Sequence, residues 1–204
     1  MRRTTGSYRG KRAFDLMVVV AVAPPAAIVG LACALVIKLT SRGPVFFRQE
    51  RVGLDGETFR VIKFRTMIDA RDNPLFPAPD RITPAGRWIR RLSLDELPQL
   101  INVARGDMSV VGPRPTLAYQ VARYDERQRR RLTVRPGLTG LAQVRGRNAI
   151  TWRERIEHDL EYLRRQSIGY DLMILWWTSK AVVQGAGVEG HPVGDTLAAE
   201  PPGS

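Results

Sequence analysis

Residues 16–37 read LMVVVAVAPPAAIVGLACALVI, a run of 22 residues without a charged side chain. A straight helix of this length is about 33 Å long, enough to cross the hydrocarbon core of a bilayer. Pro24 and Pro25 interrupt the run, because Pro25 has no N–H to donate and pushes Pro24 away from helical backbone angles. The sequence therefore predicts two half-helices, residues 16–23 and residues 26–37.

Basic side chains border this apolar stretch on both sides. Those before it are Arg2, Arg3, Arg9, Lys11 and Arg12, and those after it are Lys38, Arg42, Arg48 and Arg51. A kinked single span would put the two flanks on opposite faces of the membrane, whereas a re-entrant hairpin keeps both in the cytoplasm. The positive-inside rule favours the hairpin. We therefore expect residues 14–40 to form a re-entrant membrane hairpin broken at Pro24-Pro25, preceded by a basic segment at residues 1–13.

The composition restricts the class of protein further. Hydrophobic residues make up 44% and charged residues 25% of the 204 residues, which excludes a wholly disordered chain, and one long apolar stretch excludes a polytopic membrane protein. Lysine and arginine number 32 against 20 acidic residues, a formal net charge of +12. Such a chain favours phosphate-bearing partners: a nucleic acid, anionic lipids or a phosphorylated substrate. Because Cys33 is the only cysteine, an intramolecular disulfide is excluded.

The remaining pattern predicts a small β-hairpin followed by helices. Residues 45–49 and 58–67 have strand patterns, and Asp55-Gly56 between them is a strong turn signal. One helix is predicted from Thr83-Pro84 onward, and a second after a capping box at residues 93–96. Three more are predicted over residues 117–132, 152–163 and 172–179. The last of these is apolar, and its Trp176 and Trp177 suit a membrane interface.

The expected fold class is α+β: a mainly helical monotopic membrane protein with an N-terminal re-entrant helix-break-helix, a small β-hairpin and interfacial amphipathic helices. Residues 41–184 are expected to form a cytoplasmic catalytic domain. Residues 185–204 are rich in Gly, Pro and Ala, and we expect them to be a disordered tail.

Two adjacent carboxylates, Asp95 and Glu96, fall at the predicted start of a helix. Carboxylates so placed can hold Mg²⁺, which neutralises phosphate oxygens, or one of them can attack phosphorus and form an acyl-phosphate. A structural role is also open, because acidic residues at a helix N-terminus interact favourably with the helix dipole. The pair alone does not decide between these roles.

Cationic side chains near this pair are candidate phosphate ligands. Arg90 precedes the pair, and Arg114 stands between two prolines, which restrict the backbone and aim its guanidinium. Lys63 and Arg65 alternate on a predicted strand and so share one face, from which they could hold a diphosphate. A solvent-exposed position is the alternative for each of these four side chains.

Six short segments occur in an order that is typical of one family. They are residues 11–15 (KRAFD), 43–49 (GPVFFRQ), 63–67 (KFRTM), 93–100 (SLDELPQL), 111–115 (VGPRP) and 136–144 (PGLTGLAQV). With them the chain resembles the bacterial sugar transferases, also called monotopic phosphoglycosyl transferases, over about residues 11–184. Six ordered motifs are far more specific than any one of them.

The resemblance implies a reaction and a set of site residues. Family members move a sugar phosphate from a UDP-sugar to a polyprenyl phosphate such as undecaprenyl phosphate, and UMP is released. Carried onto this sequence, Asp95 is the nucleophile that attacks the β-phosphorus, Glu96 assists as general base or metal partner, and both would hold the required Mg²⁺. The candidate phosphate ligands are Arg114, Arg90, Lys63 and Arg65, and the residues expected near the nucleotide are Gln143 and Thr139.

The same resemblance implies a location: the cytoplasmic face of the bacterial inner membrane, with lipid and no nucleic acid as partner. Many relatives have Ser before the Pro of the break, so here the bend depends on steric restriction alone. The identity of the sugar, the glycan pathway and a homo-oligomeric state are left open. A basic nucleic-acid-binding protein would explain the charge but not the apolar stretch, and a non-catalytic membrane scaffold would not explain Asp95 and Glu96.

Overall fold

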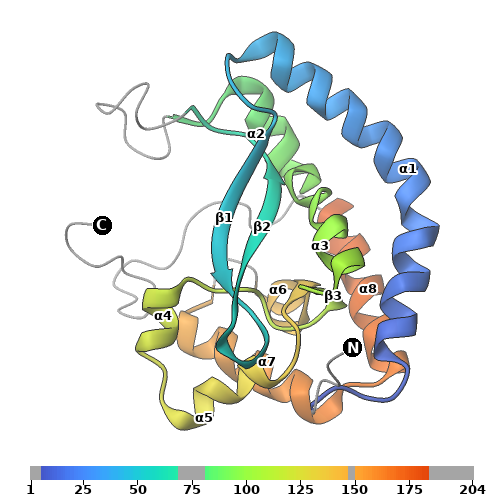
Figure 1. The fold of residues 1–204 in the computed structure, drawn as a ribbon. Helices are drawn as coiled ribbons and strands as arrows, with labels where there is room; N and C mark the ends of the chain where they lie inside the picture. The colour runs from blue at the N-terminus through green and yellow to red at the C-terminus, as the bar shows by residue number, and fades with distance from the viewer. Residues whose placement is uncertain (1–5, 69–80, 147–149, 184–204) are drawn as a thin grey trace.

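The computed structural model describes residues 6–68, 81–146 and 150–183, and the expected tail at residues 185–204 lies outside them. The elements in chain order are α1 (Lys11–Thr40), β1 (Phe46–Val52), η1 (Leu54–Gly56), β2 (Thr58–Phe64), α2 (Pro84–Arg91), η3 (Leu94–Glu96), α3 (Gln99–Arg105), β3 (Ser109–Val111), α4 (Ala118–Ala122), α5 (Glu126–Arg129), η4 (Arg130–Thr133), β4 (Gly137–Thr139), α6 (Leu141–Arg145), α7 (Trp152–Arg165) and α8 (Ile168–Val183). The described chain is mainly helical with small sheets, which confirms the α+β class (Figure 1).

The apolar stretch forms one helix rather than two. Helix α1 continues through both Pro24 and Pro25, so the predicted break at these residues is wrong. A proline withholds one N–H from the carbonyl four residues earlier, but its fixed φ is itself compatible with a helix. The helix therefore loses two hydrogen bonds and bends instead of ending. Figure 1 shows α1 curving along one side of the molecule.

Both ends of α1 pack against the rest of the described chain. Near its start, Asp15 is 1% exposed and accepts a hydrogen bond of 2.9 Å from Ser109 Oγ in β3. Near its end, Ile37 is 2% exposed and belongs to a buried cluster with Phe64 of β2. The outer face between these ends is exposed and apolar; Leu31, for example, is 74% exposed. By length and composition α1 is sufficient to cross a membrane.

A buried charged cluster connects α1 to α8. Lys11 Nζ lies 2.9 Å from Asp15 Oδ1 and 2.9 Å from Asp171 Oδ2, which belongs to the first turn of α8. The hydroxyls of Tyr8 and Tyr162 each donate to the Asp171 carboxylate at 2.9 Å. Burial of these charges is tolerated because both oxygens of Asp171 have donors. The cluster fixes the positions of α1 and α8 relative to each other.

The predicted β-hairpin is confirmed. Strands β1 and β2 pair antiparallel, with Phe46 opposite Phe64 and Val52 opposite Thr58. In the connecting turn, Asp55 has a φ of 54° and Gly56 a φ of 83°, the left-handed geometry that Asp-Gly sequences favour.

The helix predicted over residues 117–132 is wrong, because the chain forms the short elements α4, α5 and η4 there. Asp125 causes the interruption. Helix α4 ends at Ala122, and Asp125 has an extended backbone and a carboxylate that accepts a hydrogen bond of 2.7 Å from Gln128 N, so it caps the new helix α5. The helix predicted from Thr83-Pro84 is confirmed as α2, where Thr83 Oγ1 accepts a bond of 2.9 Å from Gly86 N.

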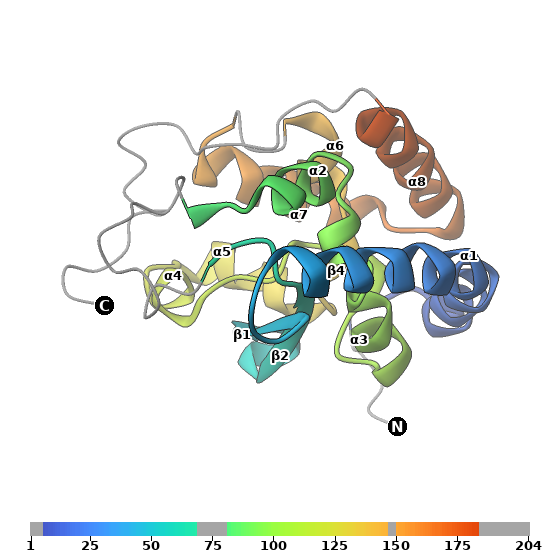
Figure 2. The same cartoon turned by 90° about the horizontal axis from the view of Figure 1, so that it is seen from above.

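The main core lies between the hairpin, the short parallel pair β3–β4, and helices α6 to α8. Its buried side chains include Val61 of β2, Met108, Val111 of β3 and Ile174 of α8. Strand β4 approaches β3 so closely that a Cβ on Gly137 would lie 2.1 Å from Gly112 N, so only glycine fits. Figure 2 shows α8 and the start of α1 on the side of the molecule opposite α4, with the rest of α1 running toward the hairpin.

Candidate active site

A tight turn between α2 and α3 carries the two adjacent carboxylates. Ser93 has a left-handed φ of 56°, and the 3₁₀ turn η3 with Asp95 and Glu96 follows it. The predicted capping box is wrong: among the described residues the Ser93 side chain makes no cap hydrogen bond. An N-cap needs an extended backbone, which Ser93 does not have. The two carboxylates therefore lie on a separate turn just before α3.

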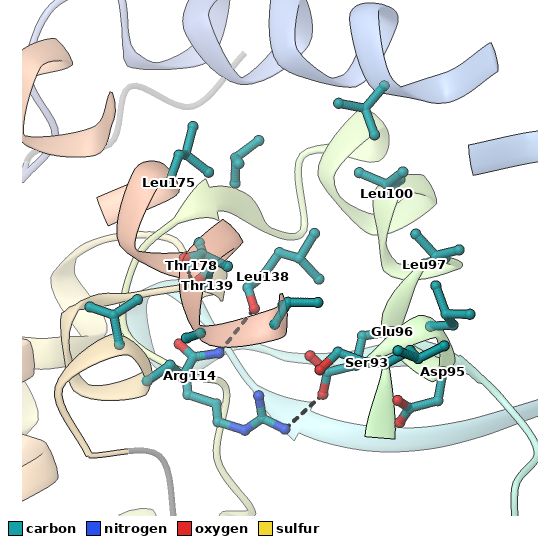
Figure 3. A pocket seen from close by; sticks show the side chains of 18 of the residues that line it. Ser93, Asp95, Glu96, Leu97, Leu100, Arg114, Leu138, Thr139, Leu175 and Thr178 are labelled. Carbon is teal, nitrogen blue, oxygen red and sulfur yellow. Dashed lines mark hydrogen bonds and ion pairs between the residues drawn. The ribbon is translucent and has the colours of Figure 1, made fainter. Parts of the chain in front are cut away.

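This turn borders a cavity of about 540 Å³. Asp95, Glu96, Lys63, Arg90 and Arg114 line one part of it, and aliphatic side chains from α1, α3 and α8 line much of the rest. Figure 3 shows Glu96 and Arg114 pointing toward each other, with Asp95 beside them. Chain segments about 50 residues apart thus bring both carboxylates and three of the four predicted cations to one place.

Glu96 is held by two cations. Its Oε1 accepts hydrogen bonds of 2.7 Å from Lys63 Nζ and 2.7 Å from Arg114 Nη2. Burial alone would raise the pKa of Glu96, but Arg114 and Lys63 outweigh burial and hold its pKa well below the ordinary value. Glu96 in turn raises the pKa of Arg114. Glu96 is therefore a fixed anion that positions two cations in the cavity.

Asp95 has a different environment although it is the next residue. Burial and the adjacent charge of Glu96 raise its pKa to about 6, against the opposing effect of Lys63, Arg114 and Arg90. Among the described residues no hydrogen bond or ion pair engages its carboxylate. Two neighbouring carboxylates with pKa values pushed apart are typical of sites where each has its own chemical role.

Arg65 does not join this site. Its guanidinium donates to the Arg42 carbonyl and to Ser41, whose Oγ lies 2.8 Å from Arg65 Nη2, at the end of α1. Arg65 does not line the cavity that Lys63 lines. The strand β2 ends at Phe64, so the alternation of faces that would have paired Lys63 with Arg65 no longer applies at residue 65.

Gln143 and Thr139 both line the cavity. Gln143 Nε2 donates a bond of 3.0 Å to the Leu138 carbonyl, whereas its buried Oε1 has no hydrogen-bond partner among the described residues. Thr139 Oγ1 lies 2.7 Å from Thr178 Oγ1, which donates to the Ile174 carbonyl at 2.8 Å. Gln143 thus has one buried acceptor without a partner among the described residues, and Thr139 links β4 to α8.

Two polar side chains of the cavity, Arg155 and Thr178, were not predicted from the sequence. Arg155 of α7 lines the cavity although it is 4% exposed, and its guanidinium carbon lies 4.9 Å from the ring centroid of Trp152. An arginine on the apolar face of a predicted helix, beside Ile156, is the signal that could have found it. Thr178 carries no such signal, because it is placed only by the packing of α8 on β4.

A buried arginine supports Arg114 from behind. Arg131, 2% exposed, donates from Nη2 to the Arg114 carbonyl at 2.9 Å and from Nε to Asp159 Oδ2 at 2.9 Å. Its Nη1 donates to Tyr124 Oη at 2.8 Å, and Trp152 Nε1 donates to the same oxygen at 3.2 Å. The backbone of the loop that presents Arg114 is thereby fixed by a fully buried ion pair.

Replacing Arg131 by methionine is expected to destabilise the fold, because it leaves Asp159 buried without its ion-pair partner. Breaking a buried pair costs about 3–5 kcal/mol, which lowers the thermal midpoint by roughly 10 °C for a chain of this size. Thermal unfolding in detergent measures the change. Arg127→Met is the matched control, because it breaks the exposed pair of Arg127 with Glu157 and should change the midpoint little. Equal midpoints for the two variants would contradict the assignment.

The metal-binding capacity of the site is limited. Within residues 6–68, 81–146 and 150–183 no group of three or more His, Cys, Asp or Glu side chains could hold a metal ion. The carboxylates of Asp95 and Glu96 are the acidic groups that line the cavity. Mg²⁺ is commonly bound by one or two carboxylates together with substrate phosphates, and this pair fits that pattern.

Comparison with known proteins identifies the family. A family model described as bacterial sugar transferase matches residues 6–185. The chain is 45% identical over 181 residues to "Uncharacterized sugar transferase EpsL" of Bacillus subtilis, covering 88% of this chain and 90% of the relative. It is 36% identical over 202 residues to "Exopolysaccharide production protein ExoY" of Sinorhizobium fredii, covering 87% and 89%. It is 44% identical over 178 residues to "UDP-glucose:undecaprenyl-phosphate glucose-1-phosphate transferase" of Caulobacter vibrioides, covering 81% and 66%. The chain therefore belongs to the bacterial sugar transferase family.

Proposed function

We propose that this chain transfers a sugar 1-phosphate from a UDP-sugar to a polyprenyl phosphate, as the first step of a glycoconjugate or exopolysaccharide pathway. The products would be UMP and a polyprenyl-diphosphate sugar. One observation carries the proposal: an Asp95 carboxylate without an ion-pair partner among the described residues stands in a cavity beside Lys63, Arg90 and Arg114. Relatives named as undecaprenyl-phosphate sugar phosphate transferases support the choice of acceptor.

The reaction proceeds in two displacements at the same phosphorus. First, an Asp95 oxygen attacks the β-phosphorus of the UDP-sugar, the bond to the bridging oxygen breaks, and UMP leaves with that electron pair. Second, a phosphate oxygen of the acceptor attacks this phosphorus and releases the Asp95 carboxylate. Covalent storage on the enzyme lets a soluble donor and a lipid acceptor use one site in turn.

The surrounding charges fit the demands of these displacements. Arg114, Lys63 and Arg90 neutralise the diphosphate under attack, which is how phosphoryl-transfer sites gain most of their rate. Glu96 keeps Lys63 and Arg114 in place and assists as base or metal partner. Gln143 and Thr139 line the same cavity and would lie near the nucleotide.

We include Mg²⁺ in the proposal. The carboxylates of Asp95 and Glu96 would hold it together with oxygens of the donor diphosphate. Bound there, the ion would supply positive charge to the phosphate oxygens.

The anchoring of α1 supports attachment from one face of the membrane. Asp15 near the start of α1 and Ile37 near its end are both buried against the same body. If α1 spanned the membrane, a hydrocarbon core about 30 Å thick would separate its two ends. The folded body that contacts both ends would then have to lie on both faces of the membrane. We therefore propose that α1 is re-entrant and bent, with the site on the cytoplasmic face of the bacterial inner membrane.

The rate of UMP release is expected to rise with pH, to be half-maximal near pH 6 and to level off above about pH 7. The pKa of Asp95 is about 6, and the protonated acid is not a nucleophile, so the rate at pH 5 should be roughly tenfold below the plateau. Single-turnover UMP release between pH 5 and 8 measures this. A profile without an acid limb near pH 6 would contradict the role of Asp95.

The same titration affects stability with the opposite sign. Because the folded pKa of Asp95, about 6, lies above the ordinary value of 3.8 for this side chain, its contribution to stability is fully present below about pH 4. That contribution is lost as pH rises through 6. Thermal unfolding of Asp95→Asn beside the wild type should therefore show the variant gaining relative stability above pH 6.

A panel of UDP-sugars with undecaprenyl phosphate and Mg²⁺, scored by UMP release and by glycolipid formation, tests the function as a whole. Mass spectrometry of protein treated with donor alone should find a phosphosugar on Asp95. Absence of UMP release with every sugar, with intact protein, would reject the function. Salt-dependent DNA binding or an unchanged glycolipid yield in Asp95→Asn would instead favour the nucleic-acid-binding or scaffold alternatives.

A further inference from the structure

Two buried hydroxyls meet at the carbonyl of Val111, the last residue of β3. Val111 is 1% exposed. Its carbonyl oxygen lies 3.0 Å from Ser109 Oγ and 3.1 Å from Tyr162 Oη of α7. Neither Ser109 nor Tyr162 lines the cavity beside Asp95, so any effect of these hydroxyls on the reaction is indirect.

Each hydroxyl also contacts a carboxylate of the buried charged cluster that connects α1 to α8. Ser109 Oγ lies 2.9 Å from Asp15 Oδ1 of α1, and Tyr162 Oη lies 2.9 Å from Asp171 Oδ1 of α8. Burial and the charge of Asp171 raise the pKa of Tyr162, so its hydroxyl keeps its proton throughout the working pH range. Each hydroxyl therefore shares its one proton between a carboxylate and the Val111 carbonyl.

The chain between the end of β3 and Arg114 is short and restricted. Gly112 N donates to the Thr139 carbonyl at 2.9 Å, and Gly137 N donates to the Pro113 carbonyl at 2.8 Å, so both residues are attached to β4. The ring of Pro113 fixes its φ in addition. A shift at the end of β3 is therefore passed on to Arg114 instead of being absorbed by a loose loop.

We infer that Tyr162 is a positioning residue for Arg114: its hydroxyl ties the end of β3 to Asp171 and thereby sets where Arg114 meets the donor diphosphate. Ser109 does the same from α1 through Asp15. The inference rests on the proposed function and extends it to a residue outside the cavity. Because α1 and α8 carry exposed apolar side chains, the connection links the helices that would contact lipid to the loop that would contact phosphate.

A double-mutant cycle tests whether Tyr162 acts through Arg114. Tyr162→Phe removes the hydroxyl and keeps the ring, which stacks on Tyr170 at a centroid distance of 6.3 Å. Tyr170→Phe is the matched control, because its hydroxyl lies 3.4 Å from Glu161 Oε1 and belongs to a different contact. Each change is made in the wild type and in Arg114→Ala. Single-turnover UMP release is measured in detergent with enzyme in excess, which also follows slow variants.

The expected result is a loss that depends on Arg114. Tyr162→Phe should lower the rate by about tenfold, the effect of one lost hydrogen bond, and Tyr170→Phe should match the wild type. In the Arg114→Ala background, Tyr162→Phe should change the rate by less than about twofold, because the group through which it acts is gone. A merely structural hydroxyl would give the same loss in both backgrounds. Equal losses, or a wild-type rate for Tyr162→Phe, would overturn the inference.

Ser109→Ala repeats the cycle with a smaller change, so the test stands even if Tyr162→Phe lacks a cooperative thermal transition. Its loss of rate should likewise require Arg114, and equal losses with and without Arg114 would count against the positioning role. A wild-type protein that releases no UMP from any UDP-sugar would overturn the proposed function itself. An active wild type whose variants show additive losses overturns only the positioning role.

Discussion

Replacement of Asp95 by asparagine will abolish turnover while the protein stays folded. Asparagine has nearly the same shape, but its amide cannot attack phosphorus, so no aspartyl phosphosugar can form. Loss of a covalent nucleophile commonly lowers kcat on the order of 10⁴-fold or more. The UMP burst with donor alone and the mass of the trapped adduct should both disappear, because both report the first displacement.

Asp55→Asn is the matched control for this variant. Asp55 lies in the exposed turn of the hairpin, at a left-handed backbone position that asparagine also tolerates. It should retain both the burst and the adduct. Circular dichroism separates a chemical from a structural loss: a collapsed spectrum for Asp95→Asn would assign Asp95 a structural role, and preserved turnover would remove it from the mechanism.

Glu96→Gln is expected to lower turnover and to shift its pH dependence as well. The substitution removes the charge that holds Lys63 and Arg114 at 2.7 Å, so both cations lose their fixed position at the diphosphate. Losing prepositioned charge stabilisation costs on the order of 10²–10³-fold in kcat. In addition, the Glu96 charge raises the pKa of Asp95. Without it the acid limb of the pH–rate profile should move below pH 6.

That shift of the acid limb distinguishes positioning from a general loss of structure. Glu50→Gln on the exposed face of β1 changes the same charge at a distance from the cavity and should leave both rate and profile unchanged. If Glu96→Gln lowers the rate with the acid limb still near pH 6, the electrostatic coupling between the two carboxylates is not present in the working enzyme.

Local signals predicted those parts of the fold that depend on neighbouring residues. Asp55-Gly56 specifies its own turn, and Thr83 caps α2 with its own hydroxyl. The predicted helix boundaries were wrong where a local signal was outweighed or overlooked. Pro24-Pro25 removes two backbone hydrogen bonds, but α1 continues through both prolines, because contacts at both of its ends hold it. Asp125 restarts a helix that the spacing of apolar residues had predicted to continue.

The sequence predicted those residues of the candidate site that stand in recognisable local motifs. Asp95, Glu96 and Arg114 stand in short motifs with restricted backbones, so sequence alone could identify them. The buried groups that fix the loop of Arg114 could not be identified that way. Arg131 reaches Arg114 through a backbone carbonyl, and its ion-pair partner Asp159 is 28 residues away in the chain. Arg65 does not line the cavity that Lys63 lines, and strand β2 ends one residue before it.

The attachment of α1 at both ends has a mechanical consequence. A helix that spans a bilayer adjusts to thicker or thinner hydrocarbon by changing its tilt. Here Asp15 and Ile37 are buried against one body, so α1 cannot rotate independently of it. If α1 lies in one leaflet as proposed, a host membrane with longer acyl chains would leave the internal geometry unaltered, and the depth of immersion would be set from the headgroup plane. Under that proposal, the vertical distance between the Asp95 carboxylate and that plane is a property of the polypeptide rather than of the lipid composition.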